Sequence, residues 1–464
     1  MPRVLLLNPP GRISYIRDNY CSYSSKANYF WEPIDLLVQS AMLQARCELT
    51  MLDAVAESLT AEQTFERVRG RRFDAILSLV GSISLAEDAE LFARLKEATG
   101  ATVAASGDLT LAEPEKTLER IPALDVALLD YTTPDFADWL GRNGDRDAAP
   151  YGSLARRIGG NIVLPDPALA PGREFAYPPP PHALFPIDRY RISTSLDKRF
   201  VTCIASLGCN MRCPFCVCSL IRLRLRTIDS LLAELRHVRG MGIREIYFYD
   251  PHFTADRRHC NERLQAMIDA KLGMVCSCNA HINVSEDTLD LLKAAGCHTL
   301  MFGIENASDE VLARYNKGIT REKIRATLER CVKRGIRTFG YFLLGLPGES
   351  EQTIVDTIRF ASELPLNYAS FNLPSPVVGT QLYRDADAAG ELRHDKPYYD
   401  RSTEAALALP GLTEQRLLEL KRIAYRRFYL RPWKALKNFR ALYPRNKWVY
   451  FLKDVWIFLK RNMV

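Results

Sequence analysis

Short apolar runs alternate with longer amphipathic segments along the second half of this chain. Each apolar run is rich in β-branched and aromatic residues and ends in polar or glycine-bearing residues, which predicts strands, whereas the segments between them carry apolar residues at helical spacing. The predicted strands start at Phe200 and then span Glu245–Tyr249, Met274–Cys278, Thr299–Phe302, Thr338–Leu344 and Ala369–Leu373. The predicted helices span Ile228–Arg239, Arg258–Ala270, Ser285–Ala295, Arg321–Arg334 and Glu351–Glu363.

This alternation predicts a parallel sheet, because each right-handed crossover places a helix against a face of the sheet. The polar residues at the strand ends would then gather at one mouth, as in an α/β barrel. Six strand–helix units are fewer than the eight of a closed barrel. We therefore expect a partial (β/α)6 barrel of the TIM type over residues 195–400, open on one side and able to admit a large substrate.

The first 150 residues show a similar alternation. The predicted strands are Arg3–Leu7, Glu48–Leu52, Ala75–Leu79, Thr102–Ala105 and Asp125–Leu129. The predicted helices are Ile34–Ala45, Thr60–Arg69, Ala86–Ala98 and Pro114–Ile121. The pattern predicts a doubly wound, Rossmann-like domain over residues 1–150, whose ligand binds beyond the carboxyl ends of the strands. No Gly-x-Gly-x-x-Gly fingerprint opens this domain, so a dinucleotide is not expected.

Three segments fall outside these two patterns. Residues 151–194 contain proline-rich stretches at Leu164–Gly172 and Pro178–Pro181, which predict an extended linker. Residues 16–31 form a long polar and aromatic loop, and a loop of that length at the ligand edge of a sheet is expected to cover a cofactor or line a substrate channel. Residues 401–464 are expected to form a basic, helical C-terminal region.

Composition adds the charge distribution. The 464 residues are 47% hydrophobic, enough for two or three domains with full cores. No run of 18 uncharged apolar residues occurs, so no transmembrane helix is predicted. The net charge is +7, yet residues 416–464 hold 14 Lys and Arg residues against Glu419 and Asp454, a net charge of +12. Such a tail is typical of segments that bind nucleic acid, anionic lipid or an acidic protein.

The end of the tail favours lipid among these partners. From Lys447, polar residues recur every seven positions and leave a wide apolar face with Trp448, Tyr450, Trp456 and Phe458. That face suits shallow insertion at a bilayer surface, and an amphipathic helix folded back over the barrel explains it equally well. Nucleic acid is not expected, because the aromatic residues do not lie among the arginines. We expect a cytoplasmic protein, peripheral at the inner membrane face if the helix inserts.

The densest chemistry follows the first barrel strand, where Cys209, Cys213 and Cys216 form a C-x3-C-x2-C motif. Thiolates are the usual ligands of a [4Fe–4S] cluster, and three of them leave one iron open for a chelating ligand. A structural zinc site needs four ligands; Cys203 or Cys218 is available as the fourth, but such sites usually have two C-x2-C pairs. Disulfides are not expected, since no secretory signal opens the chain and its 12 cysteines are scattered.

The cysteine motif resembles that of the radical S-adenosylmethionine (radical SAM) superfamily. Three later segments are similar to it as well. Phe302–Ser308 resembles the segment whose acidic residue, here Glu305, meets the adenosine ribose. Tyr341–Glu349 resembles the segment that packs against adenine, with Gly345 at its turn. Pro376–Tyr383 resembles the closure of the sixth strand.

The resemblance implies two further residues of this site. Phe215 is expected to place its ring against the cluster. Many relatives carry Gly-Gly-Glu after the second strand to bind the methionyl amino group, but this chain has Tyr249-Asp250-Pro251, so Asp250 is the expected acceptor. The alternative for both Asp250 and Glu305 is a carboxylate at the barrel mouth that makes only structural hydrogen bonds.

The Rossmann-like domain followed by this barrel resembles the cobalamin-dependent branch of the superfamily. The segments that carry the resemblance imply cobalamin contacts from Asn8, Ser82 and Gly107. The seven histidines lie at positions 182, 237, 252, 259, 281, 298 and 394, none of them in residues 1–150. The cobalt would therefore have a weak, water or absent lower ligand. The alternative is a vestigial sheet that only packs on the barrel.

The resemblance implies a radical SAM enzyme in which a 5′-deoxyadenosyl radical activates an unactivated carbon and methylcobalamin methylates it. A reductant such as flavodoxin or ferredoxin is implied, and the substrate is a small molecule or, if the tail binds membrane, a lipid-like molecule. One alternative is radical cyclisation, oxidation or carbon–carbon coupling without methyl transfer. Another is a non-catalytic, membrane-associated iron–sulfur protein. Methylthiolation is disfavoured, because no second cysteine triad precedes the barrel.

Overall fold

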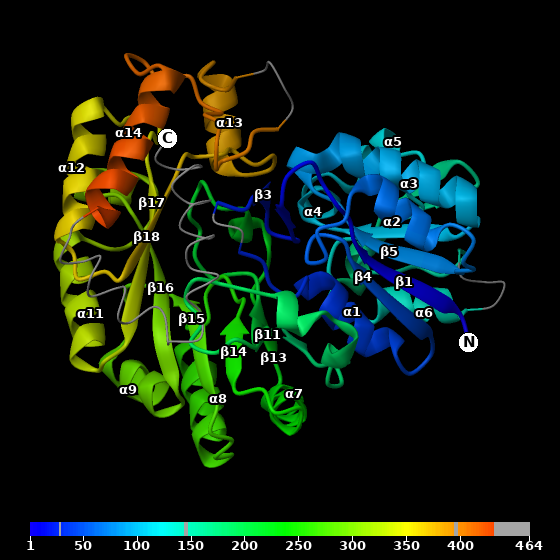
Figure 1. Ribbon diagram of the computed structural model, residues 1–464. Coiled ribbons are helices and arrows are strands. Elements are labelled where there is room, and N and C mark those ends of the chain that lie inside the picture. Colours follow the sequence, from blue (N-terminus) through cyan, green and yellow to red (C-terminus); the bar gives the residue numbers. More distant parts are fainter. Residues whose placement is uncertain (27–28, 143–146, 394–397, 431–464) are drawn as a thin grey trace. The chain divides into compact units, whose positions relative to one another are not determined.

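The computed structural model describes residues 1–26, 29–142, 147–393 and 398–430 (Figure 1). The chain divides into two compact units. The first comprises Met1–Ser25, Phe30–Tyr190 and Arg224–Val238, and the second comprises Lys26–Tyr29, Arg191–Leu223 and the chain from Arg239 onward. Each unit contains its own sheet, parallel in the second unit and mostly parallel in the first, as predicted for an α/β protein of this organisation.

The first unit is built on a seven-stranded sheet with the order β4-β1-β5-β6-β7-β8-β9. Its parallel strands are β1 (Arg3–Asn8), β4 (Glu48–Asp53), β5 (Ala75–Leu79), β6 (Thr102–Ser106) and β7 (Val126–Leu128). The connecting helices are α1 (Ile34–Leu43), α2 (Ala61–Val68), α3 (Leu85–Thr99), α4 (Asp108–Ala112), α5 (Pro114–Arg120) and α6 (Asp135–Gly141). The strand order reverses between β1 and β5, and ligands of doubly wound sheets bind at that crevice.

Helices on both faces explain why the strands of this unit are uniformly apolar. Residues Val4–Leu7 of β1 are at most 1% exposed, because α1 and α6 lie on one side of the sheet and α2, α3 and α5 on the other (Figure 1). Parallel strands buried on both faces read as continuous hydrophobic runs. That property made β1 and β5 recognisable from the sequence.

The first unit extends beyond the predicted boundary at residue 150. Two strands, β8 (Leu154–Ile158) and β9 (Asn161–Val163), continue its sheet, and β8 pairs antiparallel with β7. Segment 151–194 is therefore not a linker throughout: Leu154 and Ala155 are buried in the sheet. Farther along, β10 (Glu174–Phe175) pairs in parallel with β13 (Arg224–Arg226) of the same unit.

The second unit is an open six-stranded parallel sheet with the order β11-β14-β15-β16-β17-β18. The strands are β11 (Phe200–Cys203), β14 (Glu245–Phe248), β15 (Val275–Ala280), β16 (Cys297–Glu305), β17 (Arg337–Leu343) and β18 (Tyr368–Asn372). The helices are α8 (Arg257–Asp269), α9 (Glu286–Ala294), α10 (Asp309–Arg314), α11 (Arg321–Lys333), α12 (Glu351–Glu363), α13 (Gln381–Ala388) and α14 (Glu414–Tyr429). The preceding helix α7 (Ile228–Gly240) falls almost entirely in the first unit. The strands follow the sheet in chain order, which confirms the predicted partial barrel.

The end of the chain adds α14, which lies beside α12 and along β18 (Figure 1). None of the helices in the described part of the chain is long and apolar enough to cross a membrane. The predicted amphipathic segment from Lys447 to the end lies outside the described residues, so its insertion stays a prediction.

Candidate functional site

A cysteine loop follows β11 at the carboxyl end of the second unit's sheet. The loop turns at Gly208, whose φ is +75°. A Cβ at this position would lie 2.7 Å from the carbonyl oxygens of both Ile221 and Arg222, so only glycine fits. Beyond it, the backbone N–H of Cys216 donates to the carbonyl of Cys213 at 3.0 Å, which closes a turn inside the motif.

The three thiols of this loop form a donor set for a metal cluster and not for a single ion. Among the described residues, no group of three or more His, Cys, Asp or Glu ligand atoms within 4.8 Å of one another includes Cys209, Cys213 or Cys216. A mononuclear zinc site would bring its thiolates that close, so the fourth-ligand alternative with Cys203 or Cys218 is not supported. Burial raises the pKa of Cys209 and raises that of Cys213 to about 11, whereas a hydrogen bond with Cys218 lowers the pKa of Cys216.

Asp250 is placed beneath the start of this loop and is fully buried. Its carboxylate accepts the backbone N–H of Ala205 at 3.1 Å and the hydroxyl of Ser206 at 2.6 Å. The guanidinium of Arg263, also buried, donates to the carbonyl of Ala205 at 3.2 Å and to that of Phe253 at 2.7 Å. These contacts give Asp250 a structural role between two strand ends. Its binding of the methionyl amino group stays an untested prediction.

Two histidines that the sequence analysis did not select lie beside the cysteine loop. His252 follows β14, and its Nδ1 is 3.6 Å from Cys209 Sγ. His281 follows β15, and the two imidazole rings are 5.6 Å apart. Burial, reinforced by the positive charge of Lys317, lowers the pKa of His252 to about 3 and that of His281 to about 4. Their positions directly after predicted strands were the only signal in the sequence.

Glu305 and Lys317 form an ion pair at the end of β16. Lys317 Nζ lies 2.9 Å from Glu305 Oε1, and both residues are 8% exposed. Glu305 adopts a φ of +66° at an irregularity of the β16–β17 pairing. A Cβ at Gly303 would lie 2.7 Å from Lys317 Nζ, so glycine makes room for the pair. The sequence analysis predicted Glu305 and missed Lys317, whose position in a loop carries no local signal.

This ion pair lies next to the cysteine loop. Lys317 Nζ is 5.8 Å from the centre of the Phe215 ring. Burial alone lowers the pKa of Lys317, but the carboxylate of Glu305 and the neighbouring Cys213 and Cys216 raise it above its ordinary value. The ammonium therefore stays charged beside the three thiols. The structure thus brings Phe215 and Glu305 together with the cysteine motif, and their roles in cofactor binding stay predictions.

The turn after β17 is held rigidly by Glu349. Its Oε2 accepts the backbone N–H groups of Gly345 and Leu346 at 2.9 and 2.8 Å, and its Oε1 accepts the side-chain amide of Asn306 at 2.6 Å. Gly345 and Gly348 both have a φ of +91°, which favours glycine. The predicted adenine segment is therefore a fixed turn beside the end of β16.

The other predicted residues lie at neighbouring strand ends of the first unit. Asn8, which ends β1, donates its side-chain amide to Asp53 at 2.9 Å. Ser82, after β5, donates its N–H and hydroxyl to Asp108 at 3.0 and 2.7 Å. A Cβ at Gly107, after β6, would overlap the carbonyl of Val80. Burial raises the pKa of Asp53 to about 6 and that of Asp108 to about 7.

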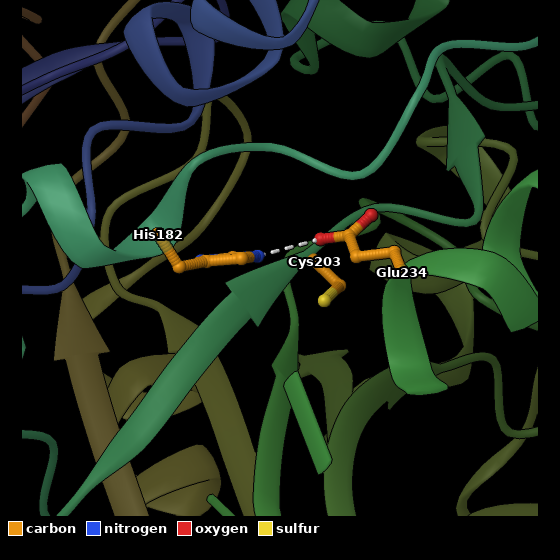
Figure 2. A group of neighbouring side chains, drawn as sticks. All are labelled: His182, Cys203 and Glu234. Carbon is orange, nitrogen blue, oxygen red and sulfur yellow. Dashed lines mark hydrogen bonds and ion pairs between the residues drawn. The ribbon is translucent and has the colours of Figure 1, made fainter. Parts of the chain in front are cut away.

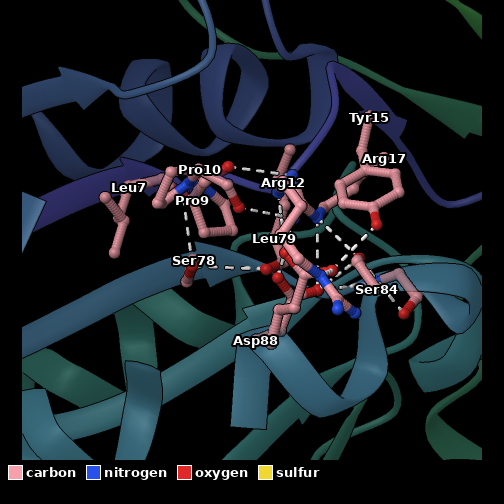
Figure 3. A network of polar contacts seen from close by, with 12 residues as sticks. Leu7, Pro9, Pro10, Arg12, Tyr15, Arg17, Ser78, Leu79, Ser84 and Asp88 are labelled. Carbon is pink, nitrogen blue, oxygen red and sulfur yellow. Dashed lines mark hydrogen bonds and ion pairs between the residues drawn. The ribbon is translucent and has the colours of Figure 1, made fainter. Parts of the chain in front are cut away.

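A buried arginine fastens the long loop over this crevice (Figure 3). Arg17 ends β2 (Tyr15–Arg17), which pairs with β3 (Ser22–Ser24). Its guanidinium lies 2.8 Å from Asp88 and donates to Ser84 and to the carbonyls of Pro9 and Pro10 at 2.8 to 2.9 Å. Segment 16–31 therefore begins as an ordered hairpin on the ligand edge of the sheet.

This edge keeps polar atoms without partners. Within the described residues, Asn19 Oδ1 and Ser22 Oγ on the loop and Gln39 Oε1 on α1 are buried and make no hydrogen bond. Buried polar groups are nearly always paired. Three such atoms at one end of a doubly wound sheet indicate a polar ligand, and cobalamin, with its peripheral amides and phosphate, fits that requirement.

A second polar cluster of the first unit is saturated internally. His182 is fully buried, and its Nε2 lies 3.1 Å from Glu234 (Figure 2). Its Nδ1 lies 2.8 Å from Glu32. Arg226 forms an ion pair with the other oxygen of Glu234. Cys203, also drawn in Figure 2, belongs to the second unit. Two cations balance two carboxylates here, so the cluster stabilises the fold and leaves no ligand position.

Comparisons with known proteins agree with this geometry. Residues 203–361 match the Radical SAM superfamily. The chain is 26% identical over 417 residues to an uncharacterized methyltransferase of Pyrococcus horikoshii, covering 88% of this chain and 89% of that protein. It is 24% identical over 333 residues to the cytidylyl-2-hydroxyethylphosphonate methyltransferase of Streptomyces wedmorensis, covering 67% and 61%. The structure resembles that of the cobalamin-dependent S-adenosylmethionine radical enzyme OxsB with aqua-cobalamin and S-adenosylmethionine bound, with a TM-score of 0.71 and 14% identity over 99% and 72% of the two chains.

The matched segment contains the cysteine loop and the four strands β14, β15, β16 and β17, so the chain is a radical SAM enzyme. The likeness in fold to OxsB extends over nearly the full length of this chain, which confirms the predicted fold class. The chain is thus similar to cobalamin-dependent radical SAM enzymes in fold and to methyltransferases in sequence, in agreement with the predicted family.

Proposed function

We propose that this enzyme methylates an unactivated carbon with S-adenosylmethionine, a [4Fe–4S] cluster and cobalamin as cofactors. The observation that carries the proposal is the arrangement at one strand-end mouth of three loop cysteines, the Glu305–Lys317 ion pair and the ring of Phe215. The names of the two curated relatives, both methyltransferases, support methyl transfer over other radical reactions. When bound, the cofactors supply a 5′-deoxyadenosyl radical and a transferable methyl group.

Each residue at the mouth of the sheet is proposed to bind a different part of the cluster or of S-adenosylmethionine. Cys209, Cys213 and Cys216 would hold three irons and leave the fourth to S-adenosylmethionine. The carboxylate of Glu305 suits the ribose hydroxyls, and the ammonium of Lys317 suits the methionyl carboxylate, since each is an ionised group that strengthens a hydrogen bond. The turn at Gly345 presents backbone to the adenine. Phe215 excludes water from the cluster side.

The first unit would hold the cobalamin. The unpaired Asn19 Oδ1, Ser22 Oγ and Gln39 Oε1 offer hydrogen-bond partners for its polar periphery. Asn8, Ser82 and Gly107 lie at the ends of three strands that include both sides of the crevice. Residues 1–150 contain no histidine, so this region cannot supply an imidazole to cobalt.

The substrate is proposed to be a small molecule or a lipid-like molecule. Only the basic tail supports the lipid, through the net charge of +12 of residues 416–464, most of which lie outside the described residues. A flavodoxin or ferredoxin is the proposed reductant. Radical cyclisation, oxidation or coupling without methyl transfer remains the alternative that the product itself decides.

The test is anaerobic reconstitution with iron, sulfide and cobalamin, followed by reaction with S-adenosylmethionine that is labelled on its methyl group. Formation of 5′-deoxyadenosine, with label in a product detected by mass spectrometry, is the expected result. The triple variant Cys209→Ala, Cys213→Ala, Cys216→Ala should lose both, whereas Cys331→Ala, a buried cysteine of α11, should keep them. Cleavage by the triple variant would overturn the proposal, and 5′-deoxyadenosine without labelled product would favour the alternative.

A further inference from the structure

His252 contacts the cysteine loop through one ring nitrogen. Its Nδ1 lies 3.6 Å from Cys209 Sγ, and the residue is buried. The backbone N–H of Met211 reaches the same sulfur at 3.4 Å. A thiolate bound to iron carries no proton and can only accept hydrogen bonds, so the nitrogen that faces it must carry the hydrogen. His252 is therefore a side-chain donor to this sulfur, next to a backbone donor.

The protein holds the His252 ring in this position from two sides. The loop backbone is fixed by hydrogen bonds from the N–H of Phe253 to the carbonyl of Asn279 and from the N–H of Ala255 to the carbonyl of His252, both 3.0 Å long. On the other side, the ring of His281 lies 5.6 Å away. All of these contacts are made within the protein.

The neighbouring His281 is itself immobilised. Its Nδ1 accepts the N–H of Asn283 at 3.2 Å, so its Nε2 carries the hydrogen and donates to the carbonyl of Lys317, also at 3.2 Å. His281 thus uses both nitrogens for the backbone and none for the cysteine loop. The two histidines consequently have different roles: His281 positions the segment that carries Lys317, and His252 points at a cluster ligand.

We propose that His252 sets the reduction potential of the [4Fe–4S] cluster by donating an N–H···S hydrogen bond to Cys209. The inference rests on the proposed function, because it requires the cluster on this cysteine. Reduction adds a negative charge to the cluster and its thiolates, and a hydrogen bond to sulfur stabilises the more negative state. His252 therefore raises the potential, and a given reductant reduces a larger fraction of the enzyme.

Three variants of the full chain separate this role from others. His252→Phe keeps a planar ring of similar size and removes the donor. His252→Asn keeps an amide N–H close to the position of Nδ1. His237→Ala removes an exposed histidine of α7 and serves as the control. Each reconstituted protein is assayed for iron and sulfide, and its midpoint potential is measured by titration followed with electron paramagnetic resonance, without substrate turnover.

The expected result is a full cluster in every variant and a lower midpoint potential for His252→Phe alone. A shift equal to a tenfold change in the ratio of reduced to oxidised cluster is about 59 mV for one electron, and His252→Asn should recover most of it. An unchanged midpoint in His252→Phe would overturn the proposal while leaving the proposed function intact. Loss of the cluster in both His252 variants would also overturn it, since His252 would then be an assembly residue. A wild-type chain without a cluster would refute the proposed function first.

Discussion

The hydroxyl of Tyr429 closes the open edge of the barrel by bonding both backbone groups of Ala369. It accepts the N–H of Ala369 at 3.0 Å and donates to the carbonyl of the same residue at 2.8 Å. One turn earlier on α14, the hydroxyl of Tyr425 makes the same two bonds to Phe371, each 3.2 Å long. Edge strands of sheets otherwise expose such groups to other chains. Here the hydroxyls of two tyrosines at i, i+4 spacing form hydrogen bonds with backbone groups that a seventh strand would otherwise pair.

Removal of these hydroxyls should therefore destabilise the barrel. Tyr429→Phe leaves the buried backbone N–H and C=O of Ala369 without the hydroxyl partner. Tyr425→Phe removes the partner of the N–H of Phe371, whereas the carbonyl of Phe371 keeps its hydrogen bond from Lys26 at 3.1 Å. A buried group left unpaired costs about 1–3 kcal/mol. We expect a lower midpoint of urea unfolding for each variant and a larger decrease for the double variant. Tyr383→Phe, whose hydroxyl caps no strand edge, is the matched control. Equal midpoints for the wild type and the four variants would show that water replaces the hydroxyls at no cost.

The elements that the sequence predicted well are those whose burial is uniform. Ala75–Leu79 and Glu351–Glu363 occur with the predicted bounds, because a strand covered on both faces and a helix with one apolar face leave clear periodicities. The strand Asn161–Val163 was missed, since it is short, mostly exposed and lies in a proline-rich segment.

The parts of the site that were missed depend on contacts between distant residues. Arg17 meets Asp88 across 71 positions, and Cys209 meets His252 across 43. The sequence around a single arginine or histidine in a loop does not predict a contact with a residue so far away in the chain. Cys209 and its two companions were found because their spacing is itself the signal, whereas Lys317 became visible only through its distance to Glu305.

The Glu305–Lys317 pair should behave as a coupled unit. Lys317→Met leaves a buried carboxylate without its cation, which costs about 3–5 kcal/mol, and should weaken binding of S-adenosylmethionine to the reconstituted enzyme. The double variant with Glu305→Gln removes both charges, so it should be more stable than Lys317→Met alone while still binding S-adenosylmethionine weakly. Urea unfolding and equilibrium dialysis measure the two effects. If the change in the free energy of unfolding of the double variant equals the sum of the changes of the two single variants, the residues are not coupled.

The stability of the first unit should depend on pH through His182. Burial lowers the pKa of His182, but the carboxylates of Glu32 and Glu234 raise it by more. The net pKa is about 10, above the ordinary value of 6.5. The folded state thus keeps a proton that the unfolded state loses above about pH 6.5. The stabilisation is complete below that pH, falls as the pH rises and is lost near pH 10. Urea unfolding at pH 6, 8 and 9.5 should show a smaller loss of stability in His182→Gln than in the wild type; parallel curves would refute this origin.

Bound cobalamin should show no axial nitrogen from residues 1–150. Residues 1–150 hold no histidine, so the Co(II) state of the full-length protein should lack nitrogen superhyperfine splitting in electron paramagnetic resonance. A nitrogen triplet would mean that the benzimidazole or a histidine from elsewhere reaches cobalt. Uptake of ¹⁵N-histidine by the expressed protein distinguishes these two sources, because only a protein ligand would change the splitting.

The C-terminal tail should bring the enzyme to anionic membranes, which would favour a lipid-like substrate. Basic residues near an anionic surface contribute about 1 kcal/mol each before screening, and residues 416–464 carry a net charge of +12. Trp448, Trp456 and Phe458 add an attraction that salt does not weaken, because it comes from burial of apolar surface. Flotation with vesicles that contain phosphatidylserine should therefore decline only partly with added salt, and vesicles of phosphatidylcholine alone should retain that salt-independent part. A chain ending at Pro444 retains Tyr425, Tyr429 and a net charge of +8 in residues 416–444, and it loses the apolar aromatic face and a net charge of +4. If this shortened chain floats as well as the full one, or if neither floats, the segment from Lys447 does not bind membrane and the proposal of a lipid-like substrate loses that support.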